Sequence, residues 1–238
     1  MDRIKTGIYE LDRMIGGFPV GKTVLIAGDA GNGKTIFALQ FADICCKGGK
    51  KAVYISTEES ADDLRQQGKS FGWDFGSLEK KGLMEFIELA GNRAEEIETA
   101  LDFGLDTTKG NFEDLLEHIP ADTNILIIDN LGNRTANLTQ DEFSDRFDLL
   151  LYDLNNRGIT ALVILDSTIP REFHDIALFS VYGAIQLHKR ENPYTDRRER
   201  VMDIVKMRNT KTPIQLLTYE INTGGIVISS PIDSSGFD

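Results

Sequence analysis

Short apolar runs alternate with longer mixed segments along the first two thirds of the chain. These runs are rich in Val, Ile and Leu, and they lie at residues 23–28, 52–57, 84–89, 124–129 and 160–166. Strands that are buried on both faces of a parallel sheet have such nearly continuous apolar sequences. The pattern therefore predicts an α/β fold with a mainly parallel central sheet.

The segments between these runs have the mixed composition and apolar spacing of helices. We expect helices at residues 34–47, 60–72 and 140–158, where they would flank the sheet. Ser60 and Asp63 have the spacing of a capping box, which places the start of the second helix at Ser60.

The pattern changes after about residue 180. Residues 182–210 read as two strands around a turn at Asn192-Pro193, and residues 214–228 read as a second hairpin. These hairpins predict a C-terminal antiparallel β extension of the parallel core. We expect one domain over residues 1–228, solvated helices within 91–122, and a disordered tail over 229–238.

Composition narrows the class of protein. With 238 residues, 41% of them hydrophobic, the chain can bury one sizeable core. Its 26 basic and 38 acidic residues give a net charge of −12, which argues against nucleic acid as the main partner. Cys45 and Cys46 are adjacent and are expected as reduced core residues. The chain begins without an apolar signal segment and has no run long enough to span a membrane, so we expect a cytoplasmic protein.

One motif predicts a phosphate-binding loop. The stretch "GDAGNGKT" at residues 28–35 satisfies G-x-x-x-x-G-K-[ST] in full, with an apolar strand before it and a helix after it. Its glycines let backbone N–H groups curl around phosphates, while Lys34 would bridge the β- and γ-phosphates and Thr35 would bind Mg²⁺. The predicted phosphate-binding residues are Gly28, Asp29, Ala30, Gly31, Asn32, Gly33, Lys34, Thr35 and Ile36.

Two further strands end in acidic residues. Asp129 closes the run at 124–129 and is predicted as the second Mg²⁺ ligand, although a strand-end aspartate can also cap a following helix. Position 130 is asparagine, so a carboxylate that activates water must come from another strand. Glu58 and Glu59, which follow the run at 52–57, are the candidates.

Consecutive extended residues point to opposite sides of a strand. Only one of the two glutamates can therefore face the γ-phosphate. We predict that Glu58 orients and deprotonates the attacking water, and that Glu59 points away toward the start of the next helix. The alternative interpretation is that both glutamates are ordinary residues at the start of a helix, without a role in catalysis.

Several stretches together resemble the RecA-superfamily ATPases of the KaiC-like branch. They are residues 6–41, 54–75, 127–130 and 205–210, the last reading "VKMRNT". The resemblance implies a RecA-like P-loop core, ATP with Mg²⁺, and homo-oligomeric rings, often hexameric, with nucleotide between subunits. It also implies that Lys206 and Arg208 reach the γ-phosphate of a neighbouring subunit. The expected function is that of a ring-forming ATPase acting as a switch or motor component.

Three alternatives stay open at this point: a RecA-like recombination or repair paralogue, a non-hydrolysing ATP sensor, and an archaellum-type accessory ATPase. The segments 130–143 and 166–175 each carry one arginine against two or three acids, which does not favour a DNA path. Asp166 stands where RecA-like proteins commonly have a polar, uncharged sensor. Thr168 and Ser180 are candidates for autophosphorylation by rough position only.

Overall fold

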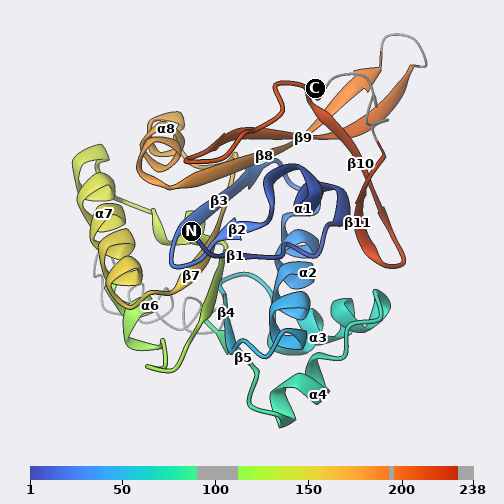
Figure 1. Cartoon of the computed structure of the whole chain (residues 1–238). Helices are drawn as coiled ribbons and strands as arrows, with labels where there is room; N and C mark the ends of the chain where they lie inside the picture. The colour runs from blue at the N-terminus through green and yellow to red at the C-terminus, as the bar shows by residue number, and fades with distance from the viewer. Residues whose placement is uncertain (90–111, 193–195, 230–238) are drawn as a thin grey trace, which may run out of the picture.

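A nine-stranded sheet forms the centre of the computed structural model, which describes residues 1–89, 112–192 and 196–229 (Figure 1). Its strands, in spatial order, are β11 (Gly225–Ile228), β10 (Leu217–Asn222), β9 (Arg197–Met207), β8 (Gly183–Asn192), β3 (Thr23–Gly28), β7 (Thr160–Asp166), β6 (Ile125–Asp129), β4 (Ala52–Ser56) and β5 (Met84–Glu88). A separate two-stranded sheet pairs β1 (Arg3–Ile4) with β2 (Phe18–Pro19).

The strands from β8 to β5 run parallel, whereas β9, β10 and β11 each pair antiparallel with a neighbour. The predicted fold class is confirmed. One strand differs from the prediction: β8, expected in the antiparallel extension, pairs in parallel with β3 from Val24↔Gly183 to Gly28↔Leu187. Helix α8 (Arg171–Ser180) returns the chain to the amino edge of the sheet, so that β8 completes a crossover before the antiparallel hairpins begin.

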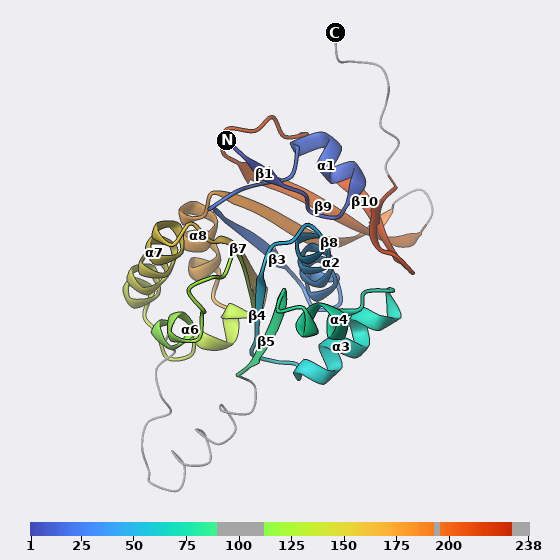
Figure 2. The same cartoon turned by 60° about the horizontal axis from the view of Figure 1, so that its bottom comes forward.

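Helices cover both faces of the sheet (Figures 1 and 2). One face packs against α1 (Tyr9–Ile15), α2 (Lys34–Lys47), α3 (Ala61–Ser70) and α4 (Phe75–Lys80), and the other against α6 (Glu113–Glu117), α7 (Gln140–Asn156) and α8. Along β3, Val24 and Ile26 pack toward the first set while Leu25 and Ala27 pack toward the second. This alternation explains why the core strands have no polar face.

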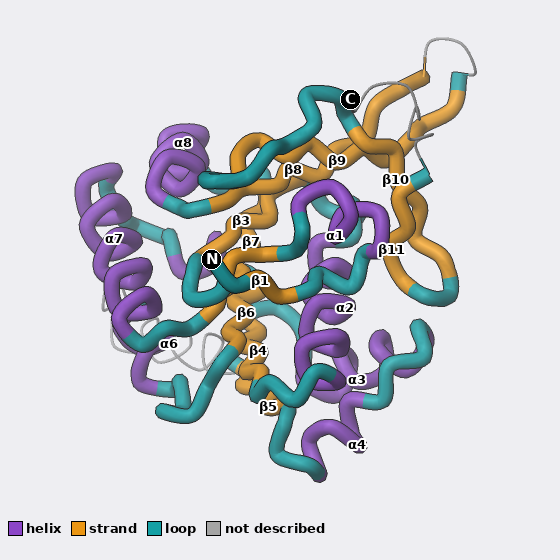
Figure 3. The backbone as a smooth tube through the Cα atoms, viewed as in Figure 1, coloured by secondary structure: helices purple, strands orange, loops and turns teal. Residues whose placement is uncertain are grey.

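The tube view of Figure 3 shows how loops at the ends of the strands connect these layers. Helix α2 has the predicted bounds, and α3 ends at Ser70, two residues earlier than expected. Ser60 caps α3 by accepting the Asp63 N–H at 3.1 Å, and its hydroxyl donates to Asp63 Oδ2 at 2.6 Å. The pair is thus a single cap, and the full capping box belongs to Thr139 and Glu142 at the start of α7.

Some predictions concern residues outside the described ranges. Solvated helices are expected in the segment 91–122. Residues 91–111 of this segment lie outside the described ranges, and α6 lies in the part that is described. The predicted tail is described only at Ser229, whose N–H donates to Thr218 O at 2.8 Å. Within the described ranges, no helix combines the length and the apolar character that crossing a membrane requires.

The two cysteines are core residues with free thiols, as predicted for their packing. Burial raises the pKa of the Cys46 thiol to about 11. The pKa of Cys45 is also raised, first by burial and then by Cys46. Both thiols therefore stay protonated at neutral pH and behave as small apolar side chains.

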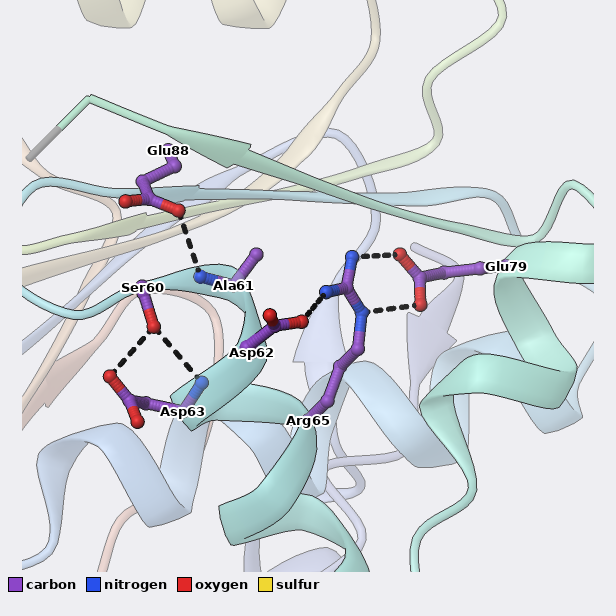
Figure 4. Close-up of polar contacts among 7 residues, drawn as sticks. All are labelled: Ser60, Ala61, Asp62, Asp63, Arg65, Glu79 and Glu88. Atoms are coloured by element: carbon purple, nitrogen blue, oxygen red, sulfur yellow. Dashed lines mark hydrogen bonds and ion pairs between the residues drawn. The ribbon is translucent and has the colours of Figure 1, made fainter. Parts of the chain in front are cut away.

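Arg65 joins α3 to α4 (Figure 4). Its Nε and Nη2 donate to the two carboxylate oxygens of Glu79, each at 2.8 Å, and its Nη1 donates to Asp62 at 2.6 Å. The guanidinium also lies 5.6 Å from the centre of the Phe86 ring. Hydrogen bonds to Glu79 raise the pKa of Arg65 against the opposing effect of burial, so the guanidinium stays charged at neutral pH.

We expect Arg65→Ala to lower the free energy of unfolding by about 1 kcal/mol, because a bidentate pair and a cation–π contact are lost while solvent screens part of their strength. Urea denaturation measures the change. The matched control is Arg171→Ala, since Arg171 is 91% exposed and lies 3.9 Å from Asp175; it should change stability by less than about 0.5 kcal/mol. Equal effects of the two variants would show that the clamp contributes nothing particular.

Candidate functional site

The loop from Gly28 to Gly33 joins β3 to α2 and curls back on itself. Gly28, Gly31 and Gly33 have φ angles of 147°, 76° and 89°, a region that disfavours other residues. At Gly28 a Cβ atom would lie 2.2 Å from the Leu187 carbonyl oxygen, so only glycine fits between β3 and β8. A loop of this shape at the start of a helix directs N–H groups inward, which is the geometry of an anion site.

Strands from the C-terminal part of the chain hold this loop in place. The buried Asn32 donates from Nδ2 to Leu187 O at 2.8 Å, and the Tyr219 hydroxyl donates to Asn32 O at 2.5 Å. The Asp29 carboxylate accepts a hydrogen bond from the Ser167 hydroxyl, which follows β7. Sequence reasoning missed these anchors, because their partners lie far away along the chain.

Lys34 lies across the mouth of the loop. Its Nζ donates to Gly28 O at 2.8 Å and to Asp29 O at 3.1 Å, so the ammonium group is directed where phosphate oxygens would bind. Asp29 and Ala30 are exposed at the tip of the loop, and Ile36 in the first turn of α2 packs against the core. The predicted phosphate-binding residues thus form one continuous segment from the end of β3 to the first turn of α2.

Asp129 meets Thr35 at the carboxyl edge of the sheet. Asp129 Oδ2 accepts hydrogen bonds from the Thr35 hydroxyl at 2.8 Å and from the Tyr54 hydroxyl at 2.5 Å. Burial raises the pKa of Asp129, and the two hydroxyl donors oppose that rise. A carboxylate and a hydroxyl beside a phosphate loop suit the oxygen-only coordination of Mg²⁺, so these side chains fit the metal that the sequence predicted.

Tyr54 is a member of this cluster that sequence reasoning missed. It is fully buried, and burial followed by the proximity of Asp129 raises its pKa well above the ordinary value. The hydroxyl therefore remains a donor. A signal did exist, because a tyrosine in the otherwise apolar run at 52–57 needs a buried hydrogen-bond partner.

Glu58 points across the ends of β6 and β7. Its Oε1 accepts hydrogen bonds from Asn130 Nδ2 at 2.7 Å and from Asn133 Nδ2 at 2.9 Å. The Asn130 amide reaches Asp166 on its other side at 2.6 Å. Glu58 therefore belongs to a polar row at the same sheet edge as the phosphate loop. Neither asparagine was predicted as a member of the site.

Glu59 turns the other way. Its carboxylate accepts a hydrogen bond from Gln67 in α3, and its backbone N–H donates to Ser56 Oγ at 3.1 Å. Burial, then the charge of Asp129, raises the pKa of Glu59. The two glutamates diverge as expected, but at the start of α3 it is Glu88 that accepts the Ala61 N–H, at 3.2 Å (Figure 4).

Lys206 and Arg208 lie at the opposite edge of the sheet. Lys206 Nζ and Arg208 Nη2 both donate to Phe179 O, the carbonyl near the end of α8, at 2.8 and 3.3 Å. Met207 between them pairs with Gly183, which is level with Val24, four residues before Gly28. At about 3.3 Å per residue the pair lies about 13 Å from the loop along the strand direction, so it is not part of its own chain's phosphate site.

The pKa of Lys206 is lowered, first by partial burial and then by Arg208. The two autophosphorylation candidates also lie apart: the Thr168 hydroxyl donates to Asp166, whereas Ser180 ends α8 and lines a pocket of about 420 Å³ between α7 and α8. The structure therefore brings together Lys34, Thr35, Asp129 and Glu58, and it does not bring Lys206 and Arg208 to them within one chain.

Known proteins are similar to this chain in sequence and in fold. The KaiC family of ATPases matches residues 4–232. The circadian clock protein KaiC3 of Synechocystis sp. is 29% identical over 235 residues, which cover 96% of this chain and 46% of KaiC3. A UPF0273 protein of Pyrococcus horikoshii is 39% identical over 87 residues, covering 36% of this chain and 35% of that protein.

A solved structure is similar over nearly its whole length. The crystal structure of a KaiC-like protein from Pyrococcus horikoshii matches with a TM-score of 0.75 and 29% sequence identity, covering 96% of this chain and 99% of that one. The chain thus spans about half the length of the curated clock protein it matches, but almost all of the chain in this solved structure.

Proposed function

The chain belongs to the KaiC-like ATPases, and from this premise we propose that it binds ATP at residues 28–35 and hydrolyses it in a ring of identical subunits. The proposal rests on one observation: groups suited to bind phosphate, to hold Mg²⁺ and to activate water lie at the same edge of the sheet. Lys34 lies over the phosphate loop, Thr35 and Asp129 meet at 2.8 Å, and Glu58 is held beside them.

Each side chain has a distinct task in this reaction. The loop N–H groups and Lys34 bind the β- and γ-phosphates. Thr35 and Asp129 would hold Mg²⁺, which neutralises phosphate charge when bound. Glu58 takes the proton of the attacking water. Among the residues that the structure describes, its two hydrogen bonds both reach Oε1, so Oε2 is the oxygen that would accept the proton.

The position of Lys206 and Arg208 supports a shared site. Both cations lie at the amino edge of the sheet, where their side chains donate only to the Phe179 carbonyl among the groups that the structure describes. A neighbouring subunit's phosphate would replace that carbonyl as the acceptor. A guanidinium delivered in this way stabilises charge on the transferred phosphoryl oxygens.

Mixing two inactive variants tests this sharing. We expect Arg208→Ala and Glu58→Gln each to bind ATP without turning it over, because one lacks the cation offered to the neighbour and the other lacks the base. In mixed rings, some interfaces pair an intact Glu58 with an intact Arg208, so ATPase activity should return. A phosphate-release assay over a range of mixing ratios measures it.

Dilution is the control for that experiment. Activity regained on mixing should disappear as the oligomers dissociate, which size-exclusion chromatography with light scattering can follow. If mixed oligomers form and regain no activity, catalysis is not shared across the interface, and Arg208 serves only as a strand residue.

The switch or motor role is part of the same proposal. The net charge of −12 and the single arginine in each of the segments 130–143 and 166–175 support a protein partner rather than DNA. The hydrogen bond that holds Glu58 to Asn130, the residue after Asp129, supports hydrolysis over a non-hydrolysing ATP sensor.

A further inference from the structure

Asn130 lies between two carboxylates at the carboxyl edge of the sheet. It directly follows β6 and is only 2% exposed. Its Nδ2 donates to Glu58 Oε1 at 2.7 Å and to Asp166 Oδ2 at 2.6 Å. The two bonds use both hydrogens of the amide, so this one group connects side chains from two different strand ends.

The amide has only one possible orientation. Asn130 Oδ1 accepts the Gly132 N–H at 2.6 Å. A flipped amide would set its oxygen against two carboxylates and its NH₂ against an N–H donor, which no hydrogen-bond geometry allows. Gly132 makes the close approach possible, because a Cβ atom there would lie 2.7 Å from Asn130 Oδ1. Thr57 holds the Asn130 backbone by two bonds, at 2.8 and 3.0 Å.

Asp166 is itself anchored. Its Oδ1 accepts the Thr168 N–H at 3.0 Å and also the Thr168 hydroxyl, while its backbone carbonyl lies 2.7 Å from His174 Nε2. One carboxylate oxygen is therefore fixed by the turn after β7. The other is left to receive the Asn130 amide.

These contacts form a chain that ends on Glu58. Asp166 fixes the Asn130 amide, and the amide fixes Glu58 Oε1, with Asn133 as a second donor at 2.9 Å. An unrestrained glutamate after a strand end would sample several rotamers. Holding it in one of them removes that entropy cost from the reaction, and catalytic groups displaced by about 1 Å lose large factors in rate.

We propose that Asp166 is a positioning residue, acting through Asn130 to aim Glu58 at the attacking water. The inference rests on the proposed role of Glu58 in hydrolysis. It gives a role to Asp166, an acidic residue at a position where RecA-like proteins commonly have a polar, uncharged one. Asp166 is hydrogen-bonded to Asn130, Thr168 and His174, and it is through Asn130 that it reaches Glu58.

Kinetics separate this role from substrate binding. We expect Asp166→Ala to lower kcat about tenfold while the Kd for ATP changes by less than about twofold. Asp166→Asn should also lower kcat, because its single amide oxygen cannot accept from both the Thr168 N–H and the Asn130 amide. Asp175→Ala on the nearby α8 is the matched control, since Asp175 is 67% exposed, and it should leave kcat unchanged.

A double-mutant cycle tests whether Asp166 acts through Asn130. If it does, the double variant Asn130→Ala/Asp166→Ala should have the same kcat as Asn130→Ala alone. If the double variant instead loses kcat by the product of the two single-variant factors, the proposal is overturned. A wild-type kcat in Asp166→Ala, when Glu58→Gln is inactive, would also overturn it.

A measurement without turnover completes the test. In ¹⁵N–¹H spectra of the nucleotide-free protein, the Asn130 side-chain amide, identified by its loss in Asn130→Ala, should be shifted downfield and exchange slowly with water. Asp166→Ala should release one of its two protons. An unchanged amide signal in a folded Asp166→Ala protein contradicts the bridge. If instead Glu58→Gln hydrolyses ATP normally, the proposed function fails while this signal still decides whether the bridge exists.

Discussion

Glu58→Gln is expected to bind ATP like the wild type and to hydrolyse it at least about 10²-fold more slowly. The amide keeps the size of the side chain and can still contact Asn130 and Asn133, but it cannot take a proton from water. General bases contribute about 10²–10⁴-fold to such reactions. Single-turnover ATPase assays, with binding of a fluorescent ATP analogue measured in parallel, separate chemistry from affinity.

Glu59→Gln is the matched control, because it makes the same chemical change one residue away. Glu59 is bound to Gln67 of α3 rather than to the row that holds Glu58. We expect turnover within a few-fold of the wild type. The opposite result, with Glu59→Gln inactive and Glu58→Gln active, would reverse the assignment of the two glutamates.

Lys34→Ala should lose ATP affinity about hundredfold. Its ammonium lies across the loop mouth at 2.8 Å from Gly28 O, and charge-assisted hydrogen bonds to two phosphates are worth about 3 kcal/mol together. Isothermal titration calorimetry with ATP and Mg²⁺ measures the change in Kd.

Lys22→Ala provides the comparison for that variant. Lys22 precedes β3 at the other edge of the sheet, where its Nζ donates to Asn155 Oδ1 at 2.5 Å. Removing it changes the net charge by the same amount, so its ATP affinity should stay within about twofold. If both lysine variants bind ATP equally well, the loop at 28–35 is not the phosphate site.

The phosphate loop and the parallel strands were accessible from sequence because they are local patterns. A strand buried on both faces needs consecutive apolar residues, and a loop that wraps phosphate needs glycines at set intervals. Divergence of Glu58 and Glu59 followed from the alternation of side chains along an extended chain. None of these inferences required a partner strand.

Prediction from sequence was weaker for residues whose contacts are with residues far away along the chain. The parallel pairing of β8 depends on the path taken through α8, which apolar periodicity does not encode. Tyr54 joins the Asp129 cluster across 75 residues, and Tyr219 reaches the phosphate loop across 187. Sheet order brings such residues together, and it results from packing over the whole core.

By itself, the sequence determined the α/β class, the glycine-rich loop between β3 and α2, and the family that the chain belongs to. Only the tertiary structure decided which polar side chains complete the site and which edge of the sheet each one occupies. Asn130 shows the reason. As a single residue after a strand it carries no signal, but the strand order places it between Glu58, 72 residues away, and Asp166, 36 residues away. Hydrogen bonds depend on distance and direction in space, and sequence spacing constrains those only within one element.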